Sequence, residues 1–106
     1  MADLLRIMQC GLGPIGQAVA RLVHDTPGLK LVAAADPADD KAGRDLGSVI
    51  GLPRKLHIKV AADAVQAARK ARPQVAIVAT TSALKDVKPL VLELVKRGMH
   101  VVTTCE

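Results

Sequence analysis

Three glycines near the start of the chain have the spacing of a phosphate-binding loop. Residues 11–16 read GLGPIG and fit the pattern G-x-G-x-x-G, which alone is a weak signal. Gly11 would allow a tight turn, Gly13 would leave room for a pyrophosphate beside the backbone, and Gly16 would let a helix pack closely on a strand. The predicted contacts of a dinucleotide with this loop are Gly11, Leu12, Gly13, Pro14, Ile15 and Gly16.

The segments around the loop strengthen this interpretation. An apolar run over 4–10 predicts a strand before it, and apolar residues at spacings of three and four over 14–25 predict a helix that opens inside it. Pro14 suits the first helical turn, where free N–H groups attract phosphate. The alternative is a glycine-rich turn that binds no ligand. The apolar stripe of the helix is expected to comprise Ile15, Val19, Leu22 and Val23.

A carboxylate is expected at the end of the next strand. Residues 30–36 predict this strand, and Asp36 closes it about 20 residues beyond Gly16, the usual interval in dinucleotide-binding proteins. Asp36 would accept hydrogen bonds from the adenosine ribose and would repel a 2′-phosphate, so the predicted cofactor is NAD. Lys41 and Arg44 follow in a polar stretch and could instead reach a 2′-phosphate, which leaves NADP open.

Hydroxyl side chains follow two later strands. The segments ATTS (79–82) and TTCE (103–106) leave their strands at the carboxyl edge of a parallel sheet, where ligands bind in open α/β folds. Thr80, Thr81 and Thr103 could line the nicotinamide ribose. Alternatively, these hydroxyls could simply cap strand ends and helix starts.

No catalytic residue and no metal ligand is predicted in this chain. Cys105 has no histidine near it in the sequence, and cysteine often serves as a small packing residue. The histidines are isolated and show no metal-ligand spacing with Cys, Asp or Glu. They are His24, His57 and His100.

Strand and helix patterns alternate along the whole chain, which is typical of β-α-β units. We expect an α/β fold of the Rossmann type, with a parallel sheet of about five strands in the order 3-2-1-4-5 and helices on both faces. Residues 1–106 would form one dinucleotide-binding domain. Beyond residue 36 the predicted elements are a helical turn over 46–53, a third strand over 57–60, a helix over 64–71 capped by Asp63, a strand and exit loop over 74–82, a helix over 83–98 and a last strand over 100–102.

Composition argues against some classes of function. The chain has 106 residues, a formal net charge of +5 and no aromatic residue. Single-stranded nucleic acids usually bind by stacking bases on aromatic rings, so no nucleic-acid partner is expected. Basic clusters at 54–59 and 69–72 are either solvated surface or a patch for phosphates. The chain shows no signal peptide, no apolar run near ~18 residues and no disulfide framework, so we expect a cytoplasmic protein without a membrane partner.

Three stretches that together span nearly the whole chain carry a family resemblance. They are GLGPIGQAVARLV, AAADP…GRDLGSVIGL and, most specifically, the closing ATTSALKDVKPLVLELVKRGMHVVTTCE. Together they resemble the N-terminal domain of the dihydrodipicolinate reductase-like dehydrogenases, and the 2,4-diaminopentanoate dehydrogenase branch looks closest. The glycine motif is less specific, because homoserine and aspartate dehydrogenases share it.

The resemblance implies an NAD(P)-dependent oxidoreductase with an amino-acid-like substrate, of the 2,4-diaminopentanoate dehydrogenase or dihydrodipicolinate reductase type. In such enzymes a larger C-terminal domain supplies the substrate-binding and catalytic groups. Because this chain stops at TTCE, that domain is expected to be absent and the chain alone is expected to be inactive. The alternative is a stand-alone nucleotide-binding or redox-sensing module without catalysis.

Self-association is expected at the last strand. In the parent enzyme, residues 101–104 would be flanked by the absent domain. Without that domain an apolar edge and face would stay open, and such surfaces pair with other chains. The sequence therefore predicts a homo-oligomer that forms through this strand.

Overall fold

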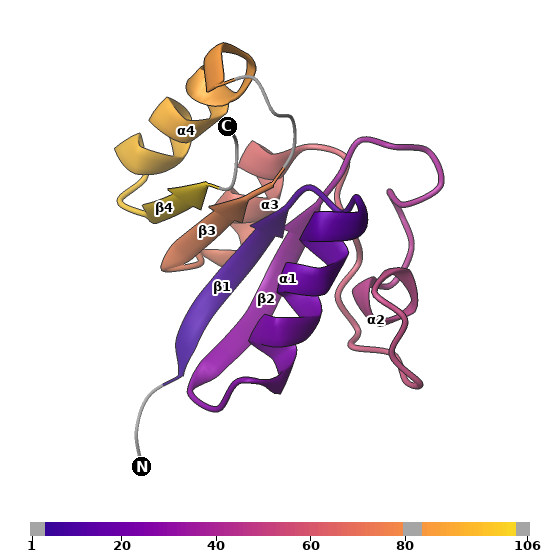
Figure 1. Ribbon diagram of the computed structural model, residues 1–106. Coiled ribbons are helices and arrows are strands. Elements are labelled where there is room, and N and C mark those ends of the chain that lie inside the picture. The colour runs from indigo at the N-terminus through magenta and orange to yellow at the C-terminus, as the bar shows by residue number, and fades with distance from the viewer. Residues whose placement is uncertain (1–3, 80–83, 104–106) are drawn as a thin grey trace.

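A parallel sheet forms the centre of the computed structural model, which describes residues 4–79 and 84–103, with side chains for all of these except 84–87. The sheet has four strands in the order β2-β1-β3-β4 (Figure 1). Cys10 aligns with Ala35 on one side and with Val78 on the other, so the strands end at the same carboxyl edge. The strands are β1 (Leu5–Cys10), β2 (Leu29–Ala35), β3 (Val75–Val78) and β4 (His100–Thr103).

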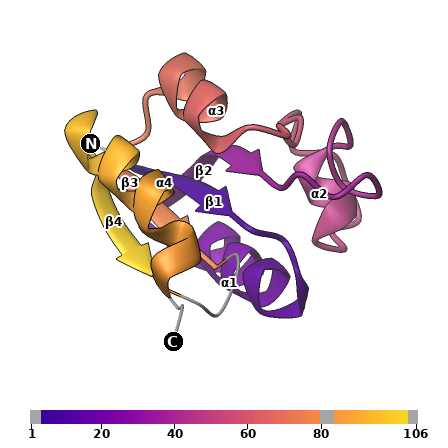
Figure 2. The same cartoon turned by 90° about the horizontal axis from the view of Figure 1, so that it is seen from above.

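Helices cover both faces of the sheet, as the sequence predicts (Figure 2). One face packs against α1 (Pro14–Asp25) and the short α2 (Leu46–Val49). The other packs against α3 (Ala64–Ala71) and α4 (Leu84–Lys96). Within the described residues, no helix combines the length and the apolar character needed to cross a membrane.

Side chains that alternate along β1 build two separate cores. Ile7 points to the side of α1 and α2, whereas Met8 and Cys10 point to the side of α3 and α4. Both cores are wholly aliphatic or sulfur-containing, and burial of each large side chain stabilises the fold by about 1.5–3 kcal/mol. Because β1 is buried on both faces, it holds the glycine loop that follows it in a fixed position.

The two helices that start with a clear sequence signal lie where they were predicted. The predicted bounds of α1 and α3 are confirmed. Asp63 caps α3, since its carboxylate accepts hydrogen bonds from the N–H groups of Val65 (2.9 Å) and Gln66 (3.3 Å). Arg72 then ends the helix in a left-handed conformation, with φ of 51°.

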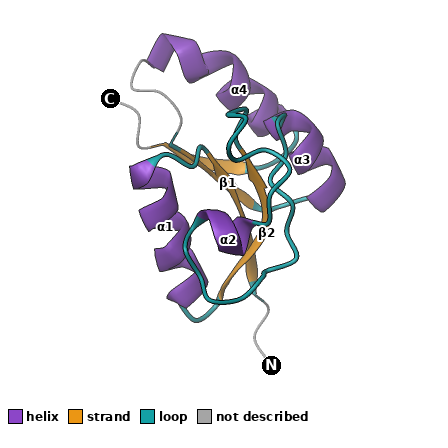
Figure 3. Cartoon of the chain, turned by 90° about the vertical axis from the view of Figure 1, so that its right-hand side faces the viewer, coloured by secondary structure: helices purple, strands orange, loops and turns teal. Residues whose placement is uncertain are grey.

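The prediction of a third strand over 57–60 is wrong. His57 has a φ of 60°, which breaks an extended run. The backbone after it pairs with the preceding loop instead: Gly43 N–H donates to the Val60 carbonyl, and Leu46 N–H donates to the Ile58 carbonyl. Only Ala61 reaches the edge of β2, where it exchanges backbone hydrogen bonds with residues 34 and 36. The connection is therefore loop apart from α2 (Figure 3), and the remaining four strands keep their predicted order.

The buried stripe of α1 also differs from the predicted one. Ile15 and Leu22 are 67% and 68% exposed, whereas the helix buries Gly16, Ala20 and Val23. The small residues at the first two of these positions bring the helix backbone close to the sheet. Ile15 and Leu22 consequently lie on an outer flank of the helix, whereas Val23 is buried and Val19 packs against the core, as predicted.

Candidate functional site

The glycine loop turns sharply between β1 and α1. Gly11 has a φ of 94°, a conformation that favours glycine, and its N–H donates to the Ala35 carbonyl at the end of β2. Gly13 is the N-cap of α1, without a side chain that could cap the helix, and Pro14 follows in its first turn. N–H groups in the first turn of a helix have no intrahelical partner, so this terminus can donate to an anion.

Gly13 and Gly16 are needed for opposite reasons. A Cβ atom on Gly16 would lie 2.0 Å from the Gly11 carbonyl oxygen, so only glycine lets α1 approach the loop this closely. A Cβ atom on Gly13 would meet nothing within 4 Å. The space in front of Gly13 is open in the chain itself, which is where the predicted pyrophosphate would lie.

Asp36 reaches from the end of β2 to the middle of the loop. Its Oδ2 accepts a hydrogen bond from the N–H of Leu12 at 2.7 Å, and its Oδ1 accepts one from the N–H of Ala38 at 2.9 Å. Each carboxylate oxygen has a second lone pair, so a ribose hydroxyl could still donate to this group. The role as a brace for the loop was missed at the sequence level, where Asp36 was assigned to the ribose alone.

Leu12 is held from both sides of its backbone. Besides the bond from its N–H to Asp36, its carbonyl accepts a hydrogen bond from Gln17 Nε2 at 2.9 Å. Its side chain is fully buried in the core beside α1. The centre of the loop is therefore fixed by two side chains and by packing, and it needs little reorganisation to receive a ligand.

Gln9 lies beneath the loop and was missed in the sequence. Its side chain is fully buried, and its Nε2 donates to the Gly11 carbonyl at 3.2 Å. Its Oε1 has no hydrogen-bond partner among the described residues. A buried amide oxygen without a partner is costly, so an apolar residue would be expected here unless the brace on Gly11 matters. The available signal was a polar residue between Met8 and Cys10, in the part of β1 that is otherwise apolar.

Lys41 and Arg44 lie in the loop after β2, and both contact Asp40. Lys41 Nζ lies 3.7 Å from Asp40 Oδ1, and Arg44 Nη1 donates to the Asp40 carbonyl at 3.1 Å. These contacts tie both cations to their own loop.

Asp45 organises the rest of this connection. Its Oδ2 accepts hydrogen bonds from the N–H groups of Gly47 and Leu56, both at 2.9 Å, and its Oδ1 accepts one from Ile58 at 3.1 Å. Burial works to raise the pKa of Asp45, but the backbone N–H groups around the carboxylate outweigh it and lower the pKa. The carboxylate thus stays charged and joins α2 to residues 56–58.

Of the three threonines predicted to follow the later strands, the structure describes only Thr103. Thr103 ends β4 opposite Val78 and so lies at the same edge as the glycine loop. Thr80 and Thr81 lie outside the described residues, as does Cys105.

The described residues include one cysteine, Cys10, and show no metal site. Burial raises the pKa of Cys10 to about 12, which keeps this thiol protonated and unreactive. Over residues 4–79 and 84–103, no three His, Cys, Asp or Glu side chains are grouped so that they could hold a metal ion.

Comparison with known proteins agrees with this geometry. The family described as "Dihydrodipicolinate reductase, N-terminus" matches residues 5–105. The curated 4-hydroxy-tetrahydrodipicolinate reductase of Agrobacterium fabrum (strain C58) is 43% identical over 56 residues, which cover 52% of this chain and 20% of that protein. This chain is therefore much shorter than the curated relative.

Solved structures confirm the α/β fold. An amine dehydrogenase from Mycobacterium smegmatis is similar with a TM-score of 0.86 and 28% identity, over 96% of this chain and 30% of that one. A dipicolinate-bound dihydrodipicolinate reductase from Paenisporosarcina sp. TG-14 gives a TM-score of 0.73 at 22% identity, over 94% of this chain and 37% of that one. The second likeness shows the fold alone.

Proposed function

This chain belongs to the dihydrodipicolinate reductase N-terminal family, whose members bind NAD(P) nucleotides, and on that premise we propose that it binds NAD at the loop Gly11–Gly16. One observation carries the proposal: the loop is fixed at Leu12 by Asp36 and Gln17, while the space beside Gly13 is open. A loop that is rigid yet leaves room for a phosphate is suited to a pyrophosphate.

The described residues divide the work of binding among them. The first turn of α1 would donate N–H groups to the pyrophosphate over Gly13, and Pro14 gives up an N–H that the helix does not need. Asp36 would accept from the adenosine ribose with the lone pairs that Leu12 and Ala38 leave free. At the far end, Thr103 would stand beside the nicotinamide ribose, together with Thr80 and Thr81. When bound, the nicotinamide supplies hydride chemistry.

The parent protein is proposed to be an oxidoreductase with an amino-acid-like substrate, of the 2,4-diaminopentanoate dehydrogenase or dihydrodipicolinate reductase type. The amine dehydrogenase and dihydrodipicolinate reductase relatives favour this class. We place its catalytic groups outside residues 1–106 and its location in the cytoplasm. The chain alone should bind cofactor without turnover, because hydride transfer needs an aligned acceptor and a proton donor. The alternative stays a stand-alone nucleotide-binding or redox-sensing module.

Binding can be tested by titration with NADH, followed by its fluorescence. The chain has no Trp or Tyr, so the protein contributes almost no background. Gly13→Val places a branched side chain in the open space and should weaken NADH binding at least about tenfold, a loss of about 1.4 kcal/mol. The control is Ala18→Val, which places the same valine side chain on an exposed position of α1 and should bind as the wild type does.

If Gly13→Val binds NADH as tightly as the wild type, the loop is not the phosphate site.

Turnover can be followed with 2,4-diaminopentanoate or dihydrodipicolinate as substrate. Robust turnover by the 106-residue chain alone would show that it contains catalytic groups and would contradict the proposed division of labour.

The cofactor preference needs a separate comparison of NADH with NADPH. Asp36 should make the wild type favour NADH modestly, because its charge lies where a 2′-phosphate would bind. Asp36→Asn removes the charge and keeps one acceptor oxygen, so it should narrow the preference. A wild type that prefers NADPH, and loses that preference in Lys41→Ala or Arg44→Ala, would assign the cofactor to NADP instead.

A further inference from the structure

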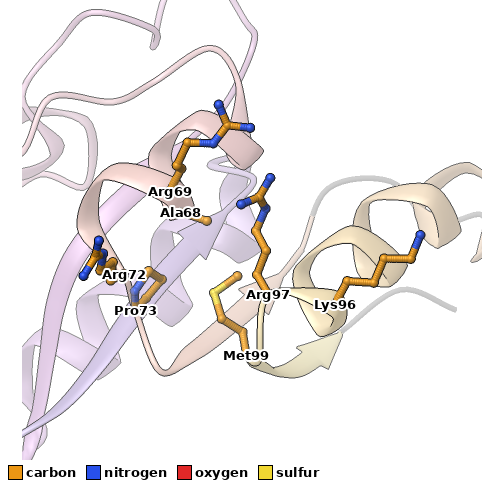
Figure 4. A pocket seen from close by; sticks show the side chains of 7 residues that line it. All are labelled: Ala68, Arg69, Arg72, Pro73, Lys96, Arg97 and Met99. Carbon is orange, nitrogen blue, oxygen red and sulfur yellow. The ribbon is translucent and has the colours of Figure 1, made fainter.

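A basic hollow lies at the edge of the sheet opposite the glycine loop. It is formed where α3 and α4 end and the chain turns into β3 and β4, and it encloses about 620 Å³ (Figure 4). Four cationic side chains line it: Arg69, Arg72, Lys96 and Arg97. No acidic side chain is among the lining residues.

The floor of the hollow is apolar. Ala68 and Met99 are almost fully buried, and Pro73 completes the floor beside them. Arg69 of α3 and Arg97, which directly follows α4, point in the same direction, with Arg72 on one side and Lys96 on the other (Figure 4). An apolar base under two guanidinium groups suits a small anion with a carbon skeleton.

The positive charge of the hollow exceeds the negative partial charge at the C-terminal ends of α3 and α4. The C-terminus of each helix carries about half a negative charge, so α3 and α4 together offset about one cation. Glu93 offsets one more, since its Oε1 lies 3.2 Å from Arg97 Nη2. Across the described residues, Arg69, Arg72 and Lys96 form no ion pair. About two positive charges are therefore left over at the hollow.

Neighbouring contacts hold the rim in place. Arg6, at the start of β1, donates from Nε (3.3 Å) and Nη2 (2.8 Å) to the carbonyl of Arg72. This bond secures the left-handed residue that ends α3. Glu93 likewise orients the Arg97 guanidinium. Of the four cations, Arg97 is thus oriented by Glu93, and the backbone that carries Arg72 is held by Arg6.

We propose that this basic hollow binds a phosphate monoester of metabolite size, at a second site remote from the cofactor loop. A phosphate group carries between one and a half and two negative charges near pH 7 on three acceptor oxygens, which matches the uncompensated charge. Arg69 and Arg97 would bind its oxygens, and the carbon skeleton would lie on Met99 and Ala68. The proposal does not depend on NAD binding, because the two sites use different residues at opposite edges of the sheet.

The test is a titration of ¹⁵N-labelled chain with glycerol 3-phosphate at fixed ionic strength. It is carried out in the Gly13→Val variant, so that phosphate binding at the start of α1 does not contribute. Amide signals of residues 68–72 and 96–99 should shift together and saturate. Arg69→Gln or Arg97→Gln should weaken binding by roughly tenfold, the usual loss when one charge-assisted hydrogen-bonding group is removed.

Arg54→Gln is the matched control, because it removes the same charge from an exposed arginine outside the hollow. It should leave the affinity unchanged. Shifts that never saturate, or an equal loss in Arg54→Gln, would reduce the effect to general charge attraction and overturn the site. Succinate serves as a second probe, and tighter binding of this dicarboxylate than of glycerol 3-phosphate would overturn the assignment to phosphate monoesters.

Discussion

The glycine loop after β1 and the longer connection after β2 leave the same edge of the sheet but are stabilised differently. The loop depends on the absence of side chains at Gly11 and Gly16, with Leu12 fixed by two neighbours. The connection over 37–62 depends on one carboxylate, Asp45, that gathers N–H groups from residues up to 13 positions away. The difference shows that backbone shape is the critical feature of the loop, whereas a hydrogen-bonded carboxylate is the critical feature of the connection.

The largest effect is expected at Gly16, where there is no room for a side chain. Gly16→Ala places a methyl group 2.0 Å from the Gly11 carbonyl oxygen, so backbone must move. We predict a loss of about 3 kcal/mol in the free energy of unfolding, which corresponds to more than ~10 °C in melting temperature. Thermal unfolding followed by circular dichroism measures this loss. The comparison variant Gly13→Ala should stay within ~1 kcal/mol of the wild type, and equal losses at the two glycines would contradict their separate roles.

The second largest effect is expected in the longer connection, at Asp45. Asp45→Asn removes the charge that gathers three N–H groups and should lower the free energy of unfolding by about 2 kcal/mol at pH 7. Because the pKa of Asp45 is lowered in the fold, its stabilisation is present above the unfolded pKa of about 3.9 and is lost as pH falls through the folded pKa. The gap between wild type and Asp45→Asn should therefore close under acidic conditions.

Urea denaturation at a series of pH values between about 7 and 2.5 tests this prediction. Asp63→Asn is the control, since Asp63 caps α3 through only two N–H groups and should cost about 1 kcal/mol. A gap for Asp45→Asn that is independent of pH would mean that the charge does not stabilise the connection.

A smaller effect is expected from the buried amide beneath the loop. Gln9→Met keeps the size of the side chain, removes the unpaired Oε1 and also removes the bond to the Gly11 carbonyl. We expect stability to change by less than ~1 kcal/mol, while NADH affinity falls by about threefold because the loop is less well fixed. Gln66→Met on the exposed side of α3 is the control. If Gln9→Met binds NADH with unchanged affinity, Gln9 does not contribute to the binding site.

The smallest effect concerns association of the chain through β4. Val102 is 55% exposed on this edge strand, so the homo-oligomer predicted from the sequence has an apolar contact point there. Val102→Lys should weaken self-association without altering the fold, because a lysine on an edge strand opposes pairing with another chain. Sedimentation velocity over a range of concentrations measures it, and a wild type that stays monomeric throughout would contradict the prediction.

The sequence predicted the loop well because its cause is local. Fixed glycine spacing, Pro14 and the strand before them are adjacent in the chain, and the structure places them as expected. The connection after β2 was harder to predict from the sequence, because Asp45 bonds to residues far along the chain. The apolar alternation at 57–60 suggested a strand, but its backbone groups bond to residues 43–46 instead.

Other features depend on packing that no short pattern reveals. Gly16 and Ala20 bring α1 so close to the sheet that the buried stripe moves away from Ile15 and Leu22. The bond between Asp36 and Leu12 joins two segments whose closeness follows from the strand register, and it could have been inferred only once β1 and β2 were aligned.

The central claim is that the loop fixed at Leu12 binds the dinucleotide, and an NMR titration of ¹⁵N-labelled wild-type chain with NADH tests it most directly. We predict that the largest amide shifts fall on residues 11–13 and 15–17 of the loop and the start of α1, and on Asp36 and Ala38, since the Asp36 carboxylate bonds to Leu12 in the loop. Amides at 69–72 and 97–99, at the basic hollow, should barely move. Shifts concentrated at the basic hollow, with the loop unmoved, would contradict the account.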